Sequence, residues 1–379
     1  MALVAKMKGY NIILVIPDKM SQEKINHLRA LGAEIIITRS DVGKGHPEYY
    51  QDLAKKLAKE RNAYFINQFE NPSNPLAHET TTGPEIWEQM QHNVDAIVVG
   101  VGSSGTITGL SRFFNTVSKK TEIILADPKG SVLADYVNNG NLSNFVGSWI
   151  VEGIGEDFIP PIADLSFTKK AFTITDKESV STVSELLQKE GILAGSSTGT
   201  LLCAALKYCK EQKTEKRVIT FACDSGNKYL SKMYNNFWLL DNGLYERKKY
   251  SDIRDIISRR FEDGDTIILN HNDTLNTAFS RMKLYDISQL PVFDGEKLVG
   301  IVDETDILIA LSSSNSAMNN EINSIMASNL VTVKSGASIS TLIEILKSGL
   351  VVIVEDYNNK FCGIITKIDL INYLRNEKR

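Results

Sequence analysis

The sequence is poor in the residues that build metal sites and disulfide frameworks. Four cysteines and five histidines occur in 379 residues, and neither set has the spacing of metal ligands. The cysteines stand among apolar residues, which is typical of reduced thiols in a cytoplasmic protein. They are Cys203, Cys209, Cys223 and Cys362. These features argue against a metalloenzyme and against a disulfide-stabilised secreted domain.

The sequence also lacks a strong excess of charge of one sign and a long hydrophobic run. The formal net charge of −4 does not favour a general role in binding nucleic acids or membrane surfaces. No apolar stretch reaches transmembrane length, and no signal peptide is visible. With 42% hydrophobic and 23% charged residues, the composition predicts a cytoplasmic globular protein of two or more domains.

What the sequence does contain, over its first 240 residues, is an alternation of apolar runs and helix-like patterns. Because strands and helices alternate, we predict an α/β fold with a parallel sheet and helices on both faces. The expected strands include residues 11–16, 34–38, 63–66, 95–99 and 217–222. Residues 1–8 have the pattern of the end of a helix with no strand before it, so we expect an N-terminal portion to precede Met1.

The most informative stretch is residues 95–109, in which the glycine turn, residues 102–106, follows the strand at residues 95–99. A strand that turns on glycines into a helix presents free backbone N–H groups, and the helix N-terminus adds partial positive charge. The turn therefore predicts a phosphate site. Gly100, Gly102 and Gly105 spell G-x-G-x-x-G, the dinucleotide fingerprint, and Asp127 stands where a ribose-binding acid belongs.

A second interpretation of the glycine turn is a cup for a single phosphate monoester. The hydroxyls of Ser103, Ser104 and Thr106 would add donors to the backbone N–H groups, as a dianionic monoester requires. The turn alone leaves both interpretations open.

Further loops fall at predicted strand ends, where open α/β sheets bind their ligands. Gln68 precedes a turn-rich segment at residues 71–78, and residues 151–155 place two glycines after an expected strand. Residues 195–199 form either a second anion cup or an ordinary serine cap of a helix. Ser225 follows the strand at residues 217–222.

The last 130 residues or so contain an internal repeat. Residues 287–306 and 350–369 share one pattern of two strands and a helix start, and a helix precedes each copy. Because half-sized copies leave apolar faces that only pairing would bury, we expect them to dock together. Residues 312–316, rich in serine, are the expected joint between them.

Motif order identifies a resemblance. Lys8-Gly9-Tyr10, Ser73–His78, Gly102–Gly109, residues 151–160 and Cys223-Asp224-Ser225, followed by the repeat, resemble the fold type II pyridoxal-phosphate enzymes of β-replacement, and in particular the cystathionine β-synthase family. The resemblance implies a tryptophan-synthase-β-like catalytic domain at residues 1–243, incomplete at its N-terminus. A linker at 244–252 and a tandem CBS-domain (Bateman) module at 253–379, with copies at about 253–312 and 317–379, would follow. A dehydrogenase would explain only the glycine turn and Asp127.

The resemblance also implies roles for individual residues. Pyridoxal 5′-phosphate would be held at its phosphate by the glycine turn and at its pyridine nitrogen by Ser225. Gln68, Gly153 and Gly155 would lie near the amino-acid substrate. The phosphate-binding residues would be Gly102, Ser103, Ser104, Gly105 and Thr106.

The family's reaction condenses L-serine with L-homocysteine to L-cystathionine through an aminoacrylate, in cysteine biosynthesis by transsulfuration. Cysteine synthesis from O-acetylserine and sulfide, or release of hydrogen sulfide, would share that intermediate. A different class of function, a nucleotide-sensing or assembly protein with an inactive catalytic half, also stays open. We expect a homodimer or homotetramer.

In the CBS-domain pair, Asp306 and Asp369 occupy the place of the acid that binds a ribose diol in such modules. Thr366 matches the module's hydroxyl position, but the first copy has Asp303 there, whose carboxylate would repel the phosphate of AMP or ATP. We expect S-adenosylmethionine or another adenosyl ligand at the second site. Assembly without any ligand is the alternative.

One departure from the family is serious. Its members carry the Schiff-base lysine and an asparagine-containing loop before the helix that ends in Lys8-Gly9-Tyr10, and this sequence begins after both. No lysine here matches that motif, so we assign no catalytic residue and expect that the chain as printed does not catalyse β-replacement.

Overall fold

The computed structural model describes residues 1–142, 146–314 and 316–377. The chain divides into two compact units, Met1–Leu239 and Leu240–Arg379, and each is described by itself. Across the described residues, no helix combines the length and the apolar character that crossing a membrane would require.

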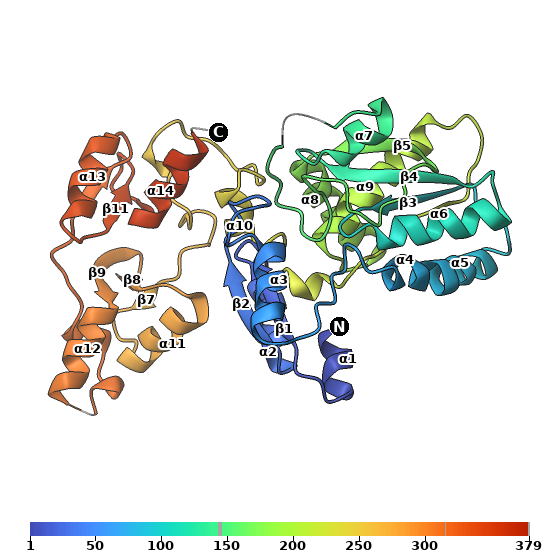
Figure 1. The fold of residues 1–379 in the computed structure, drawn as a ribbon. Coiled ribbons are helices and arrows are strands. Elements are labelled where there is room, and N and C mark those ends of the chain that lie inside the picture. The colour runs from blue at the N-terminus through green and yellow to red at the C-terminus, as the bar shows by residue number, and fades with distance from the viewer. Residues whose placement is uncertain (143–145, 315, 378–379) are drawn as a thin grey trace. The chain divides into compact units, whose positions relative to one another are not determined.

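The first unit is built on a four-stranded parallel sheet with the strand order β5-β4-β3-β6. Figure 1 labels β5, β4 and β3 of this sheet. The central strands β3 and β4 pair in register from Ala96 opposite Glu122 to Gly100 opposite Ala126. The apolar, largely β-branched run in β3 is buried on both faces, as central parallel strands require. The strands are β3 (Ala96–Gly100), β4 (Glu122–Pro128), β5 (Thr168–Ile174) and β6 (Val218–Ile219).

Helices cover both faces of this sheet, as the sequence predicts. Because successive side chains of a strand point to opposite faces, Ile97 and Val99 pack with Leu110 and Phe114 of α6, whereas Ala96 and Val98 pack with α9. The helices here are α6 (Gly105–Val117), α7 (Leu133–Asn139), α8 (Asp176–Glu190) and α9 (Ser196–Glu211). The sheet therefore has one hydrophobic core on each side.

The first strands form a sheet of their own. β1 (Ile13–Pro17) and β2 (Glu34–Thr38) pair in parallel, accompanied by α1 (Ala2–Met7), α2 (Gln22–Ala30) and α3 (Tyr50–Glu60). Ser21 caps α2 by accepting a hydrogen bond from the Lys24 N–H. The remaining elements of this unit are short: α4 (Ser73–Ala77), the π-helical turn η1 (His78–Thr82), α5 (Gly83–Gln89), η2 (Gly226–Lys228) and α10 (Asn236–Asp241), whose end passes into the second unit.

Three expected strands are wrong or too long. Residues 63–66 form no strand; Tyr64 there is 84% exposed, so the apolar run is a surface connection rather than a buried strand. The described residues directly before Val151, 146–150, form no strand. The strand expected at 217–222 is reduced to β6 at the sheet edge, where it pairs with β3 only at Ala96 and Ile97. Apolar composition alone does not show whether a neighbouring strand is available.

The second unit contains two similar halves, which confirms the repeat. Each half has a three-stranded sheet with one parallel and one antiparallel pairing. The first half comprises β7 (Leu269–Asn270), α11 (Leu275–Tyr285), β8 (Gln289–Asp294), β9 (Lys297–Asp303) and α12 (Glu304–Ser313). The second comprises β10 (Thr332–Lys334), α13 (Ile339–Lys347), β11 (Val352–Glu355), β12 (Phe361–Ile365) and α14 (Lys367–Asn376).

The two halves pack against each other through aromatic rings. Phe261 stacks on Phe293 with ring centroids 5.4 Å apart, and both meet Phe361 edge-on. Of the expected serine-rich joint, Ser312 and Ser313 end α12, and residue 315 lies outside the described residues.

The core of each half also contains residues from the segment that precedes the other half. The turn η3 (Ile253–Asp255), ahead of the first half, lies in the second half's core with Ile256 and Ile257. The turns η4 (Ala317–Asn319) and η5 (Ile322–Ser324), ahead of the second half, contribute Ala317 and Ile322 to the first half's core.

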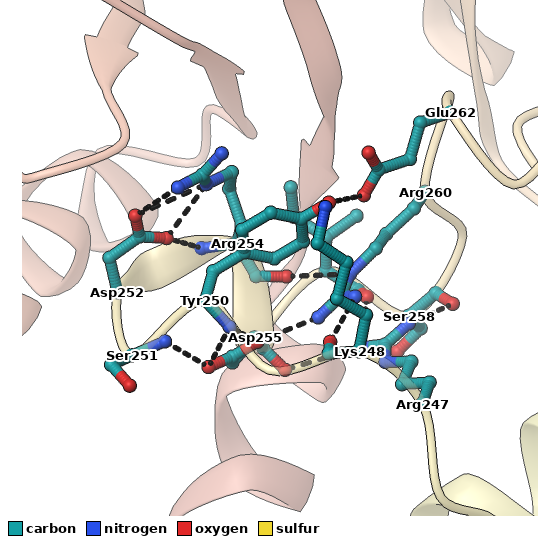
Figure 2. A network of polar contacts seen from close by, with 11 residues as sticks. Arg247, Lys248, Tyr250, Ser251, Asp252, Arg254, Asp255, Ser258, Arg260 and Glu262 are labelled. Carbon is teal, nitrogen blue, oxygen red and sulfur yellow. Dashed lines mark hydrogen bonds and ion pairs between the residues drawn. The ribbon is translucent and has the colours of Figure 1, made fainter.

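A buried arginine ties the start of the second unit together (Figure 2). Arg260, 2% exposed, pairs with Asp255 at 2.7 Å and donates to the backbone oxygens of Arg254 and Lys248. The ring of Tyr250 lies under the guanidinium of Arg254 at 3.8 Å. Much of the segment predicted as a linker is thus folded onto the residues that follow it.

Candidate functional site

The glycine turn sits where β3 ends and α6 begins. Ser104 adopts the left-handed conformation at φ +69° and forms the N-cap of α6, whose first-turn N–H groups have no acceptor within the helix. A Cβ at Gly102 would lie 2.5 Å from the Gly153 carbonyl oxygen, so only glycine fits there. The turn offers backbone donors and the positive end of a 13-residue helix at one place.

A pocket with a volume of about 430 Å³ opens at this turn. All five residues predicted to hold a phosphate line it, together with the predicted Gly153. Other segments complete the wall: Lys24 from α2, His78 and Thr82 from η1, Ser197 from α9, and Glu152, Cys223, Asp224 and Tyr229 from loops and η2's end. The pocket therefore lies at the carboxyl end of the central strand, where open α/β sheets bind ligands.

Asn74 and His78 contact the hydroxyls of two residues of the glycine turn. The Asn74 amide donates to Ser103 Oγ at 2.9 Å. His78 Nε2 lies 3.2 Å from Thr106 Oγ1, and its Nδ1 lies 3.0 Å from Thr82 Oγ1. Burial lowers the pKa of His78, which favours the neutral ring.

The pocket wall also contains a buried carboxylate, Glu152, that pairs with two lysines. The Glu152 side chain is 1% exposed, and its two oxygens pair with Lys24 Nζ at 2.8 Å and Lys232 Nζ at 2.7 Å. Lys24 also donates to the Tyr229 hydroxyl, which donates to Asp224. This network, which we call the Glu152 clamp, joins α2 to the loop at 151–155 and to the residues after η2.

Three residues given roles by the resemblance lie outside the pocket lining as the structure describes it. Ser225 is exposed and accepts a hydrogen bond from the Asn227 N–H as the cap of η2. Gln68 is exposed, and its backbone oxygen accepts from Asn74. Gly155 is buried at φ +87° and donates its N–H to the Val101 oxygen.

Asp127, the acid that a dinucleotide would need, is buried. Its Oδ2 accepts the Ala134 N–H at 2.8 Å, and burial raises its pKa to about 6. Glu156 interacts electrostatically with Asp127, and burial raises the pKa of Glu156 to about 8. Neither Asp127 nor Glu156 lines the pocket, so the carboxylate that would distinguish a dinucleotide is not presented there.

In the second unit, the residues expected to bind an adenosyl ligand act as helix caps. Thr366 and Asp369 form a capping box at the start of α14, and Asp303 and Asp306 form the matching box at α12. Ser258, from the segment ahead of the first half, donates to Asp369. The carboxylates of Asp306 and Asp369 therefore already accept hydrogen bonds from the protein.

Sequence reasoning missed several residues of the pocket wall. His78 and Asn74 lie in the segment at residues 71–78, which is turn-rich and part of the resemblance but gives neither residue a role. Their spacing of four residues, typical of one helix face, was the available signal. Lys24, Glu152 and Tyr229 come from three distant segments, and no local pattern connects them. α9 begins at Ser196 after an N-cap at Gly195, so the expected serine cap of this helix is wrong. The Ser196 and Thr198 hydroxyls instead accept the backbone N–H groups of Glu152 and Cys223, respectively.

Comparison with known proteins matches both units. Residues 1–224 match the family model "Pyridoxal-phosphate dependent enzyme", and residues 253–313 and 322–376 match "CBS domain". A cystathionine beta-synthase of Dictyostelium discoideum is 33% identical over 393 residues, covering 99% of this chain and 77% of that protein. Cysteine synthase A of Escherichia coli is 38% identical over 236 residues, covering 61% of this chain and 72% of that one.

A solved structure shares the fold. A hydrogen sulfide-producing enzyme from Fusobacterium nucleatum superposes with a TM-score of 0.55 at 31% identity, over 60% of this chain and 75% of that one.

Proposed function

The chain belongs to the pyridoxal-phosphate dependent enzymes and carries a pair of CBS domains, and from this premise we propose that it acts in β-replacement, joining L-serine to L-homocysteine to give L-cystathionine. The observation that carries the proposal is the glycine turn, whose five residues line one pocket at the end of β3. Similarity to a cystathionine beta-synthase along 99% of the chain supports it.

The residues of the pocket suit the phosphate of this cofactor. Gly102, Ser103, Ser104, Gly105 and Thr106 all line the pocket, so their backbone N–H groups and the hydroxyls of Ser103 and Thr106 would be the donors to a phosphate there. The Ser104 hydroxyl donates to the Ser103 carbonyl oxygen instead. A monoester is favoured over a dinucleotide because Asp127 is buried and bound to the Ala134 N–H. When bound, pyridoxal 5′-phosphate would supply an electron sink for breaking bonds at the α- and β-carbons of an amino acid.

The remaining assignments stay proposals. Ser225 would meet the pyridine nitrogen, and a neutral hydroxyl there would leave that nitrogen largely unprotonated, which suits elimination. Gln68, Gly153 and Gly155 would lie near the amino acid, and Gly153 is supported by its place in the pocket wall. In the second unit, Asp306, Thr366 and Asp369 would take an adenosyl ligand such as S-adenosylmethionine, and we propose a homodimer or homotetramer.

We also propose that the chain as printed does not turn over. The lysine in the described pocket wall is Lys24, and its ammonium is paired with Glu152 and bonded to Tyr229. An amine held in this way is not a free nucleophile. Borohydride reduction in the presence of pyridoxal 5′-phosphate, followed by peptide mass spectrometry, tests this: we expect Lys24 to stay unmodified, and a reduced adduct on it would contradict the proposal.

A second substrate pair is favoured by the catalytic unit alone. Its 38% identity to a cysteine synthase A and its likeness to a hydrogen sulfide-producing enzyme support O-acetylserine and sulfide. A nucleotide-sensing or assembly role, with an inactive catalytic half, is supported only by the engaged lysine in the pocket.

The experiment is a titration of the full chain with pyridoxal 5′-phosphate, followed by addition of L-serine or O-acetylserine while the cofactor absorbance is recorded. We expect cofactor binding and a larger spectral change with L-serine. A larger change with O-acetylserine would favour cysteine synthesis. Binding of NAD with no binding of pyridoxal 5′-phosphate would overturn the proposal, and an adenosyl ligand that binds while the cofactor does not would leave the sensing role.

A further inference from the structure

We propose that Asn74 and His78 are positioning residues. They contact the Ser103 and Thr106 hydroxyls of the glycine turn and orient them toward the cofactor phosphate. The inference rests on the proposed function, because it takes the glycine turn as the phosphate site. It gives a physical role to the segment at residues 73–82, which otherwise is only a short helix followed by the π-helical turn η1.

Close packing built into both segments brings them together. A Cβ at Gly109 would lie 2.3 Å from the Pro75 oxygen and 2.7 Å from His78 Cβ. A Cβ at Gly105 would lie 1.9 Å from Asn74 Oδ1. The two glycines of α6 thus create the room that Asn74 and His78 use. The contact between His78 and Thr82 lies within the π-helical turn η1, a feature that is frequent at functional sites.

The first contact leaves a hydroxyl proton available. The Asn74 amide nitrogen donates to Ser103 Oγ and to the Gln68 oxygen, both at 2.9 Å, which uses its two hydrogens. Because Ser103 Oγ accepts there, its own proton remains for an anion in the pocket.

The second contact sets a direction of donation. A phosphate dianion only accepts hydrogen bonds, so the Thr106 hydroxyl must donate to it and accept from His78 Nε2–H. His78 Nδ1 is then unprotonated and accepts from the Thr82 hydroxyl. In this chain Thr82 donates to His78, His78 donates to Thr106, and the Thr106 hydroxyl donates to the phosphate, which requires a neutral His78 in the Nε2–H tautomer. The lowered pKa of His78 agrees with a neutral ring.

The test compares the affinities of the full chain for pyridoxal 5′-phosphate and for pyridoxal, which lacks the phosphate. We expect His78→Leu and Asn74→Ala to weaken binding of pyridoxal 5′-phosphate about tenfold each and to leave pyridoxal binding unchanged. Thr82→Val should show part of the loss, and Thr82→Ser should restore it. Thr80→Val is the matched control, because Thr80 lies in the same turn but bonds only the Leu76 oxygen.

A spectroscopic readout separates positioning from simple packing and needs no variant. In ¹⁵N spectra of the wild-type chain with saturating pyridoxal 5′-phosphate, His78 should be neutral with its proton on Nε2. A proton on Nδ1, or equal losses for pyridoxal and its phosphate in the variants, would overturn the inference while leaving the proposed function intact. A wild-type chain that binds both probes equally well, or neither, would overturn both.

Discussion

Replacing the buried carboxylate of the Glu152 clamp should destabilise the first unit. Glu152→Gln keeps the shape of the side chain and removes its charge. Two lysine ammonium groups, 2.8 and 2.7 Å from the present carboxylate oxygens, would then share one amide. Because the amide has a single acceptor oxygen, one ammonium would face an NH₂ donor in a largely buried place.

The size of the effect follows from the burial of the partners. Removing one partner of a fully buried ion pair costs about 3–5 kcal/mol. Here the Lys24 and Lys232 side chains are still 22% and 16% exposed, so part of their hydration is retained. We therefore expect a loss of about 2–3 kcal/mol, which corresponds to a fall of about 4–12 °C in Tm for a unit of this size.

Thermal unfolding followed by tryptophan fluorescence measures this loss near the clamp. Lys232 lies 5.9 Å from the Trp238 ring centroid, and Lys19, whose oxygen accepts from Lys232, lies 5.1 Å from that of Trp149. The control is Glu211→Gln, which breaks an exposed pair with Lys170 and should cost at most about 1 kcal/mol. Equal changes in Tm for the two variants would refute the reasoning.

Three further outcomes are expected. Gly105→Ala forces a methyl group against Asn74 Oδ1 and should cost about 1–3 kcal/mol of stability. It should also lower the affinity for pyridoxal 5′-phosphate at least tenfold in the cofactor titration. An unchanged affinity would contradict the close contact between Gly105 and Asn74. Burial raises the pKa of Glu156 from its ordinary 4.5 to about 8, so between these pH values the folded chain keeps a proton that the unfolded chain has lost, and stability falls as pH rises. Glu156→Gln should make the denaturant midpoint fall less steeply with pH. An unchanged pH dependence of the midpoint would exclude Glu156 as its source. Arg260→Met removes the donor to the Lys248 oxygen and the ion pair of Asp255, whereas the Arg254 oxygen keeps the Ile257 N–H. It should destabilise the second unit by about 2–4 kcal/mol, seen as earlier proteolysis of residues 240–262.

The sequence predicts those parts of the site that are local in the chain. The run from Ala96 through Gly105 specifies a buried strand, a tight turn and a helix start within ten residues, so the position of the pocket at the glycine turn could be predicted from the sequence. The Glu152 clamp could not, because Lys24, Glu152 and Lys232 are separated by 128 and 80 residues and each is unremarkable in its own segment. The failed strand at residues 63–66 shows the same limit: burial depends on partners that the local pattern does not name.

The repeat of the second unit can be recognised in the sequence, whereas the exchange of core residues between its two halves cannot. Ile253, Ile256 and Ile257 precede the first half, yet they are at most 4% exposed in a core with Leu342, Val352 and Ile365 of the second half. Ala317 and Ile322 make the reciprocal exchange. Because each core lacks apolar residues without the other half's leading segment, separating the halves would expose both cores at once, and the pair should fold as one cooperative body. The hydrogen bond from Ser258 to Asp369 joins the same exchanged segment to the start of α14. Any ligand that drew Asp369 away would therefore act on the segment that enters the second unit, without needing contact with the first half's own strands.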